Sequence, residues 1–219
     1  MWADASDIPP HVYVFDMEWI GDSNIPARTH ITQIAAYCTA NGSLFSKVVR
    51  PLASRETIDK YSMVDVPDNV TYDVKSVIIS FWDWICEQEK WTSGSFANPV
   101  VLVAHNGIRF DATILLSNVQ RCGLTIPHNL IMLDSLYHVR HHLKHREDTL
   151  KQFSVEHLAT HLGIEVNSDA RHDASYDVQL LHNILTTLQN KWDIPYISGM
   201  PHNMQHISPM VVRGIGPTI

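Results

Sequence analysis

The sequence predicts an α/β fold in which three strands come first and strands then alternate with helices. Residues 31–38 and 43–51 are short apolar-rich runs joined through Asn41-Gly42, and an Asn-Gly pair between two such runs is a strong hairpin signal. Residues 98–106 form a near-continuous apolar run, which is typical of a strand covered on both faces. We therefore expect an antiparallel group followed by buried strands with helices beside them.

The first elements follow in order. Residues 12–19 are rich in β-formers and predict the first strand, which precedes the hairpin. Residues 53–73 are polar, contain Pro67 and show no period, so we expect a loop there. Residues 74–91 place apolar side chains at helical intervals; these are Val77, Ile78, Phe81, Trp82 and Ile85.

The second half alternates between the two element types. After the strand at 98–106, residues 111–123 predict a helix closed by Gly123. The remaining predicted elements are a strand running into a helix at 130–143, a short amphipathic helix at 154–164 and a longer one at 175–192. We expect one domain over residues 11–190, an N-terminal tail at 1–10 and, because prolines recur, an irregular tail at 191–219.

Composition narrows the class of protein. The 219 residues are 45% hydrophobic, and 16 Lys and Arg against 23 Asp and Glu give a net charge of −7, so no global basic field attracts nucleic acid. Cys38, Cys86 and Cys122 lie far apart, which predicts reduced thiols inside a cell. Residues 1–10 lack a signal-peptide pattern and no apolar run approaches roughly 18 residues. We expect an intracellular protein, cytoplasmic or nuclear, with no membrane partner.

The most informative residues are acidic. Asp16 and Glu18 lie two apart in the first predicted strand, and period-two geometry turns both carboxylates to one face. Such a pair is costly to bury unless a cation neutralises it, and hard divalent cations prefer oxygen ligands. Asp111, His172 and Asp177 follow at the starts of predicted helices. This order suits a two-metal nuclease, whereas Asp111 and Asp177 taken alone are also typical acids of a helix N-terminus.

Three segments carry a resemblance to a known family. Residues 15–19 (FDMEW), 104–111 (AHNGIRFD) and 172–177 (HDASYD) resemble the three motifs of DEDDh-type 3′–5′ exonucleases, in the expected order. The sequences of residues 102–115, 133–139 and 157–164 are most similar to those of the three-prime repair group. The resemblance spans roughly residues 11–190. It implies an RNase H-like mixed sheet, with three antiparallel strands and then parallel strands, flanked by helices.

The resemblance also implies a mechanism. Asp16, Glu18, Asp111 and Asp177 would hold two Mg²⁺ ions, for which Mn²⁺ is a substitute, with Asp16 as the bridging ligand. Two metals about 3.5 to 4 Å apart clamp the attacking and leaving oxygens of an in-line displacement. His172 would take the proton from the attacking water, because a general base works best with a pKa near the operating pH and histidine starts at about 6.5.

Substrate contacts are predicted around these motifs. The segment 138–146 carries Arg140, Lys144 and Arg146 among four histidines, and with Arg109, Arg121, Lys151 and Arg171 it could hold a phosphate backbone. A second metal site on the histidines is the weaker alternative to histidines on a solvated helix. Where the family has a small residue, Thr, Gly and an apolar residue, this chain has Trp19, Ile20, Gly21 and Asp22. We predict that Trp19 stacks on the terminal base, and we place further substrate contacts at Ile20, His105 and Asn106.

The sequence therefore predicts a metal-dependent 3′–5′ exonuclease that releases nucleoside 5′-monophosphates. Its partner would be single-stranded or 3′-ended nucleic acid, with DNA the first choice. Two alternatives remain open: an exoribonuclease, since no residue pattern reads the 2′-hydroxyl, and a catalytically silent RNase H-like module that binds nucleic acid. Oligomeric state is also open, with a homodimer as one option.

Overall fold

The computed structural model describes residues 12–22, 25, 28–51, 53–89, 99–144, 150–199 and 201–207. A mixed sheet in the strand order β3-β2-β1-β4-β5-β6 forms its centre. The strands are β1 (Val12–Ile20), β2 (His30–Cys38), β3 (Leu44–Val48), β4 (Val100–Ala104), β5 (Leu130–Asp134) and β6 (His202–Asn203). The first three pair antiparallel, β4 and β5 run parallel to β1, and β6 pairs antiparallel with β5. The predicted α/β architecture is confirmed.

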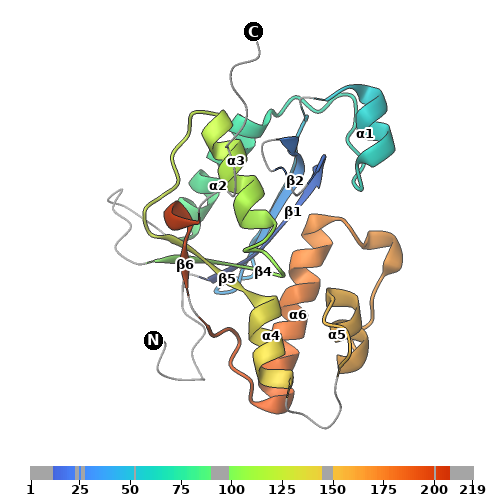
Figure 1. The fold of residues 1–219 in the computed structure, drawn as a ribbon, viewed down its shortest axis with the longest axis vertical. Helices are drawn as coiled ribbons and strands as arrows, with labels where there is room; N and C mark the ends of the chain where they lie inside the picture. The colour runs from blue at the N-terminus through green and yellow to red at the C-terminus, as the bar shows by residue number, and fades with distance from the viewer. Residues whose placement is uncertain are drawn as a thin grey trace.

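Helices cover both faces of this sheet (Figure 1). The helices are α1 (Arg55–Tyr61), α2 (Val74–Gln88), α3 (Asp111–Arg121), α4 (Ser135–Leu143), α5 (Val155–Leu162) and α6 (Ala174–Trp192). Side chains of α2 and α3 pack in one buried cluster, and those of α4, α5 and α6 pack in the other. The long helix α6 lies against β1 and β2.

Strand β1 shows how the sheet positions the acidic residues. Tyr13 and Phe15 belong to the cluster with α2 and α3, whereas Val12 and Val14 belong to the cluster with α6. Because side chains alternate between faces, Asp16 and Glu18 continue the face of Val12 and Val14. They therefore project at the carboxyl end of β1 on the side that α6 covers. The register shifts between Glu18 and Trp19, and such bulges often redirect side chains beside functional sites.

Two expectations were wrong in detail. Residues 53–73 were expected to form a loop, but they include α1, which Ser54 caps by accepting the N–H of Thr57. Only Ile58 of that helix is buried, so the sequence contains no helical spacing of apolar residues that would predict it. Of the irregular tail expected over residues 191–219, residues 208–219 lie outside the described residues, as does the N-terminal tail expected over residues 1–10. The described part of the C-terminal tail is partly ordered, because β6 adds to the sheet edge and Ile194, Tyr196 and Met204 are buried. Because the segment contains several prolines and the strand has only two residues, the sequence pattern did not predict this strand.

The described residues include no helix long and apolar enough to cross a membrane. All three cysteines are free thiols, as the spacing predicted.

Candidate active site

The four predicted carboxylates converge at one edge of the sheet. Asp16 and Glu18 come from β1, Asp111 opens α3, and Asp177 lies in the first turn of α6. Each of the last three carries a charge that acts on Asp16. Residues distant in the chain therefore form one acidic cluster, as the motifs predicted.

Asp111 is held against β1 by the backbone. Its Oδ1 accepts the N–H of Met17 at 3.2 Å, and Met17 is the residue between Asp16 and Glu18. Asp111 is 3% exposed. This bond links the start of α3 to the acidic pair, and the parallel pairing of β1 with β4 brings the two motifs together.

The loop before α3 is tightly packed. A Cβ on Gly107 would lie 2.4 Å from the Cβ of Ala104, so no larger residue fits. Asp134 at the end of β5 accepts the N–H groups of Asn106 at 3.0 Å and Ile108 at 3.2 Å. Sequence reasoning missed Asp134, although an Asp directly before a predicted helix is a capping signal; it does cap α4, through the N–H of Leu136.

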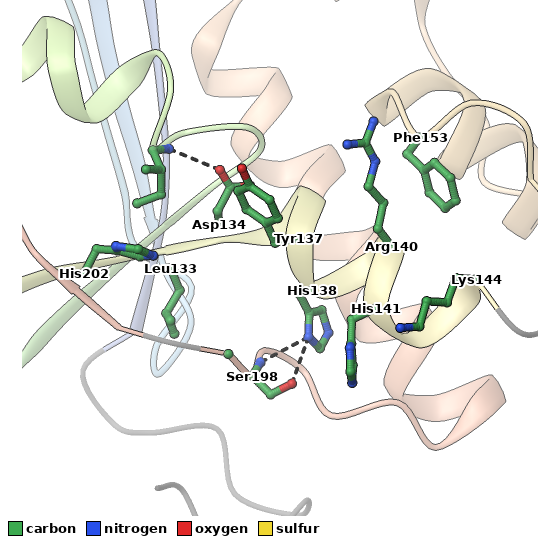
Figure 2. A pocket seen from close by; sticks show the side chains of 12 residues that line it. Leu133, Asp134, Tyr137, His138, Arg140, His141, Lys144, Phe153, Ser198 and His202 are labelled. Carbon is green, nitrogen blue, oxygen red and sulfur yellow. Dashed lines mark hydrogen bonds between the residues drawn. The ribbon is translucent and has the colours of Figure 1, made fainter. Parts of the chain in front are cut away.

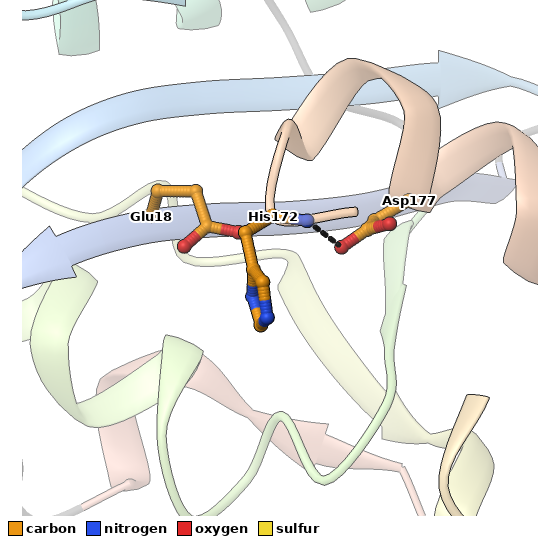
Figure 3. A group of neighbouring side chains, drawn as sticks. All are labelled: Glu18, His172 and Asp177. Atoms are coloured by element: carbon orange, nitrogen blue, oxygen red, sulfur yellow. Dashed lines mark hydrogen bonds between the residues drawn. The ribbon is translucent and has the colours of Figure 1, made fainter. Parts of the chain in front are cut away.

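His172 lies on the loop that enters α6. Its backbone φ of 67° is left-handed, which is uncommon for a residue other than glycine and marks functional sites. Its N–H donates to Asp177 Oδ2 at 3.3 Å, and its side chain is exposed. Ligand atoms of Glu18, His172 and Asp177 all lie within 4.8 Å of one another (Figure 3). The structure thus brings the predicted base to the acidic cluster.

A buried glutamine positions this loop. Gln33 on β2 is opposite Glu18 in the sheet, and its side chain bonds Asp173 Oδ1 at 3.0 Å and the N–H of Ala174 at 3.0 Å. Asp173 caps α6 by accepting the N–H of Ser175. Sequence reasoning missed Gln33, whose only signal is one amide within an apolar strand.

The electrostatics of the cluster favour a cation. Burial, and then the negative charges of neighbouring carboxylates, raise the pKa of Asp16 well above its usual range and that of Glu18 to about 8. Burial raises the pKa of Asp111 to about 7 and also raises that of Asp177. Carboxylate oxygens are the ligands that Mg²⁺ and Mn²⁺ prefer. The donor set therefore fits hard divalent cations, which would remove the cost of ionising these groups together.

This electrostatic arrangement predicts how stability depends on pH. Without metal, Asp111 and Glu18 hold protons in the folded state up to pH of about 7 and 8, while carboxyls in the unfolded chain titrate near pH 4. The folded state binds more protons in that window, so the free energy of unfolding should fall as pH rises from about 5 to 8. The melting temperature in EDTA should fall accordingly, by a few degrees.

Replacing Glu18 with Gln should flatten that fall, whereas the exposed Glu165→Gln serves as a matched control and should leave it unchanged. Mg²⁺ should raise the melting temperature most at the alkaline end. A melting temperature in EDTA that stays level or rises over this range contradicts the assigned electrostatics.

The predicted substrate residues near the cluster have mixed surroundings. Trp19 is half-buried and stacks on Phe110 with ring centroids 6.1 Å apart, and the Arg109 guanidinium lies 5.0 Å from the Phe110 ring centroid. Ile20 is 2% exposed and packs with Ile58 and Val66. Trp19 thus follows Glu18 in the chain but packs partly against the cluster of α2 and α3, Arg109 is exposed beside Phe110, and the structure gives Ile20 a packing role.

His105 and Asn106 build the loop from inside. The ring of His105 contacts Ser135 Oγ at 3.0 Å through Nδ1 and the carbonyl of Phe153 at 2.8 Å through Nε2. Asn106 has a left-handed φ of 60°, which asparagine tolerates. Both ring nitrogens of His105 thus already have protein partners, so we assign it to positioning the loop that carries Asp111.

Helix α4 with its C-cap Lys144, called the basic helix below, lines a pocket of about 900 Å³ beside this loop (Figure 2). The pocket is lined by the cations Arg140 and Lys144, the aromatic residues Tyr137 and Phe153, and Asp134 and Ile108. The Arg140 guanidinium is 5.6 Å from the Phe153 ring centroid. Arg140 and Lys144 are exposed; Arg146 lies outside the described residues. Two predicted cations thus line a pocket that also includes Ile108 of the loop before Asp111.

The four neighbouring histidines differ: His141 is exposed, as expected on a solvated helix, whereas His138 and His142 contact Ser198, and His145 lies outside the described residues. His138 is 3% exposed, and its Nδ1 accepts the N–H of Ser198 at 3.1 Å. Burial lowers the pKa of His138 to about 4 and lowers that of His142, so neither adds positive charge near neutral pH. Within the described part of the chain, the cluster with metal-ligand geometry is that of Glu18, His172 and Asp177. His138 and His142 instead hold Ser198, in the segment after α6, against α4.

Two other predicted phosphate contacts are engaged elsewhere. Arg121 donates to the carbonyl of Thr29 at 2.6 Å and to the side chain of Asn118. Arg171 binds Asp177 and Glu156. Their side chains therefore have structural partners that the sequence does not reveal.

The strand order and the flanking helices match the predicted RNase H-like mixed-sheet fold. Solved structures confirm the fold: cell-death related nuclease 4 superposes with a TM-score of 0.60 over 83% of this chain and 64% of that one, at 14% identity. Exonuclease I of E. coli in complex with a dA16 oligonucleotide gives a TM-score of 0.59 over 84% of this chain and 42% of that one, at 17% identity.

Sequence relatives point to the same class. The chain is 42% identical over 90 residues to exonuclease DPD1, chloroplastic/mitochondrial, of Arabidopsis thaliana, covering 41% of this chain and 28% of that protein. It is 30% identical over 127 residues to three prime repair exonuclease 2 of Mus musculus, covering 55% of this chain and 52% of that protein. The chain thus spans about half or less of these relatives, and no family model matches it. The predicted resemblance to DEDDh-type exonucleases is confirmed.

Proposed function

We propose that this chain is a metal-dependent 3′–5′ exonuclease that hydrolyses phosphodiester bonds from the 3′ end of DNA and releases nucleoside 5′-monophosphates. The observation that carries this proposal is the convergence of Asp16, Glu18, Asp111 and Asp177 beside the exposed His172. The names of the two sequence relatives, both exonucleases, support it. Retention of all five residues argues against a silent binding module.

The four carboxylates, His172 and Trp19 each have a role in this proposal. The four carboxylates would hold two Mg²⁺ ions, or Mn²⁺ in their place, which when bound stabilise charge on the reacting phosphate. His172 is exposed on a loop anchored by Gln33 and Asp173, so its ring can reach an attacking water and accept its proton. Trp19, which follows Glu18 and stacks on Phe110, offers a ring to the terminal base.

The basic helix supplies the sequence-independent part of binding. Because the chain carries a net charge of −7, a polyanion needs a local cationic surface. Arg140 and Lys144 provide one beside the loop that carries Asp111, and Exonuclease I of E. coli, which has a similar fold, forms a complex with a dA16 oligonucleotide. A single strand entering the site with its 3′ end would lie across this pocket. We extend the assignment to Arg146 from sequence alone.

The direction of attack is the sharpest test of this function. A 5′-labelled single-stranded DNA should be shortened stepwise, and a bulky group on its 3′ end should stop the reaction while a 5′ block does not. The matched control is a circular single strand, which should remain intact. Digestion of the circle would identify an endonuclease, and an RNA of the same sequence in a parallel reaction separates the exoribonuclease alternative.

The basic surface makes a separate prediction. Replacing Arg140 and Lys144 together with Gln should raise KM severalfold and flatten its salt dependence, because each phosphate contact on a single strand adds about −0.7 to the slope of log K against log salt. The turnover number should remain close to wild type. A control pair, Arg50→Gln with Lys75→Gln, makes the same charge change at exposed positions on other elements. Equal KM values for the two double variants would remove the basic helix from the proposed binding path.

A further inference from the structure

One arginine of the site has no role in the chemistry described so far. Arg171 directly precedes His172, and its side chain is 14% exposed. One guanidinium nitrogen, Nη1, binds Asp177 Oδ1, and Nε binds Glu156 Oε1 on α5 at 3.3 Å. An arginine has no accessible uncharged form. Arg171 therefore places a permanent positive charge on an oxygen that the proposed metal site requires.

The charge of Arg171 reaches beyond its direct partner. Its positive charge also acts on the carboxylates of Asp16 and Glu18, the two acidic residues of β1. Among the described residues, Arg171 is the cation that forms a salt bridge with a carboxylate of the cluster. In the metal-free protein it thus performs part of the neutralisation that divalent cations would supply.

The same contact opposes metal binding. A metal ion at Asp177 Oδ1 would bring a second cation to an oxygen already bound to the guanidinium, and two cations at that distance repel. Arg171 cannot relieve this repulsion by losing a proton, so its guanidinium must move. Glu156, half-exposed in the first turn of α5, provides a second carboxylate that can retain it.

We propose that Arg171 is an internal counter-cation of the acidic cluster that must leave Asp177 before metal binds there, and that it thereby sets the metal concentration at which the site fills. This inference rests on the proposed metal site. It makes Arg171 a positioning residue: it stabilises the metal-free state and weakens the apparent affinity for the metal.

The test compares metal binding in wild type and Arg171→Gln without using catalysis. Calcium titration by calorimetry and thermal melting in Mg²⁺ should show half-saturation of the variant at about tenfold lower metal, equal to about 1.4 kcal/mol. In EDTA the variant should melt below wild type, and saturating Mg²⁺ should narrow or reverse that difference. The control Arg50→Gln removes an exposed positive charge on the loop after β3 and should leave the midpoint unchanged.

A second measurement on the unaltered protein detects the movement itself. In ¹⁵N-arginine-labelled protein, the side-chain Nε–H signal of Arg171, assigned with Arg171→Lys, should shift on Ca²⁺ addition with the same midpoint as the calorimetric titration. A signal that stays fixed at saturating Ca²⁺, or a Gln variant that binds metal no more tightly than wild type, overturns the proposal. Absence of metal binding by wild type would instead overturn the proposed function.

Discussion

Asp16→Asn should reduce exonuclease turnover by about 10³-fold or more, because the lost carboxylate lies at the centre of the acidic cluster and would hold the metals that stabilise the reacting phosphate. The fold should be retained. Asp16 pairs in register with Ala35 through the backbone of β1, and the amide is close in size to the carboxyl group. Stability in EDTA should equal or exceed that of wild type, since burial opposes ionisation of Asp16.

The matched control is Asp169→Asn, which makes the same chemical change at an exposed position in the turn before His172. Turnover should be measured on single-stranded DNA at saturating Mg²⁺, with circular dichroism to confirm the fold. If Asp16→Asn retained more than a tenth of the wild-type turnover while folded, Asp16 would not be a metal ligand.

His172→Ala should remove most of the turnover while keeping binding of metal and of the strand. Its imidazole is the group placed to accept the proton of the attacking water, and general bases contribute typically about 10²- to 10⁴-fold. The side chain is exposed, and the backbone N–H that binds Asp177 remains in the variant. The left-handed φ of 67° makes Asn a useful second replacement, because asparagine tolerates that conformation.

The two roles separate in a pair of measurements. Turnover at saturating Mg²⁺ should be low in both the Ala and the Asn variant, because neither side chain can accept the proton of the attacking water. Strand affinity in Ca²⁺ should match wild type. His206→Ala, at an exposed position far along the chain, is the control for loss of a histidine. Full wild-type turnover in His172→Ala would assign the base role to another group.

The sequence alone predicted the elements that carry the chemistry. The i, i+2 spacing of Asp16 and Glu18 required a strand to turn both carboxylates to one face, and β1 does so. Asp111 and Asp177 were expected at helix starts, where they lie. These predictions depend on local periodicity, and each motif keeps its local geometry in the fold.

What the sequence could not predict depends on contacts between distant segments. The bonds of Gln33 to the start of α6, of Asp134 to the loop before α3, and of Arg171 to Asp177 join residues whose proximity no periodicity encodes. Arg171 was expected on a phosphate, and the structure places it on an acidic ligand. His138 illustrates the same limit. It lies in a helix rich in polar residues, yet it is buried and accepts the N–H of Ser198, a contact with a distant segment.

The most direct test of the central claim is the metal dependence of product release from a 3′-labelled single-stranded DNA. The account predicts labelled mononucleotide as the first product in Mg²⁺ or Mn²⁺, no product in EDTA, and restoration when Mg²⁺ is added back in excess. Asp16→Asn in the same assay should release about 10³-fold less product than wild type in either metal. Undiminished release in EDTA, or labelled oligonucleotides as first products, would contradict a metal-dependent 3′–5′ exonuclease.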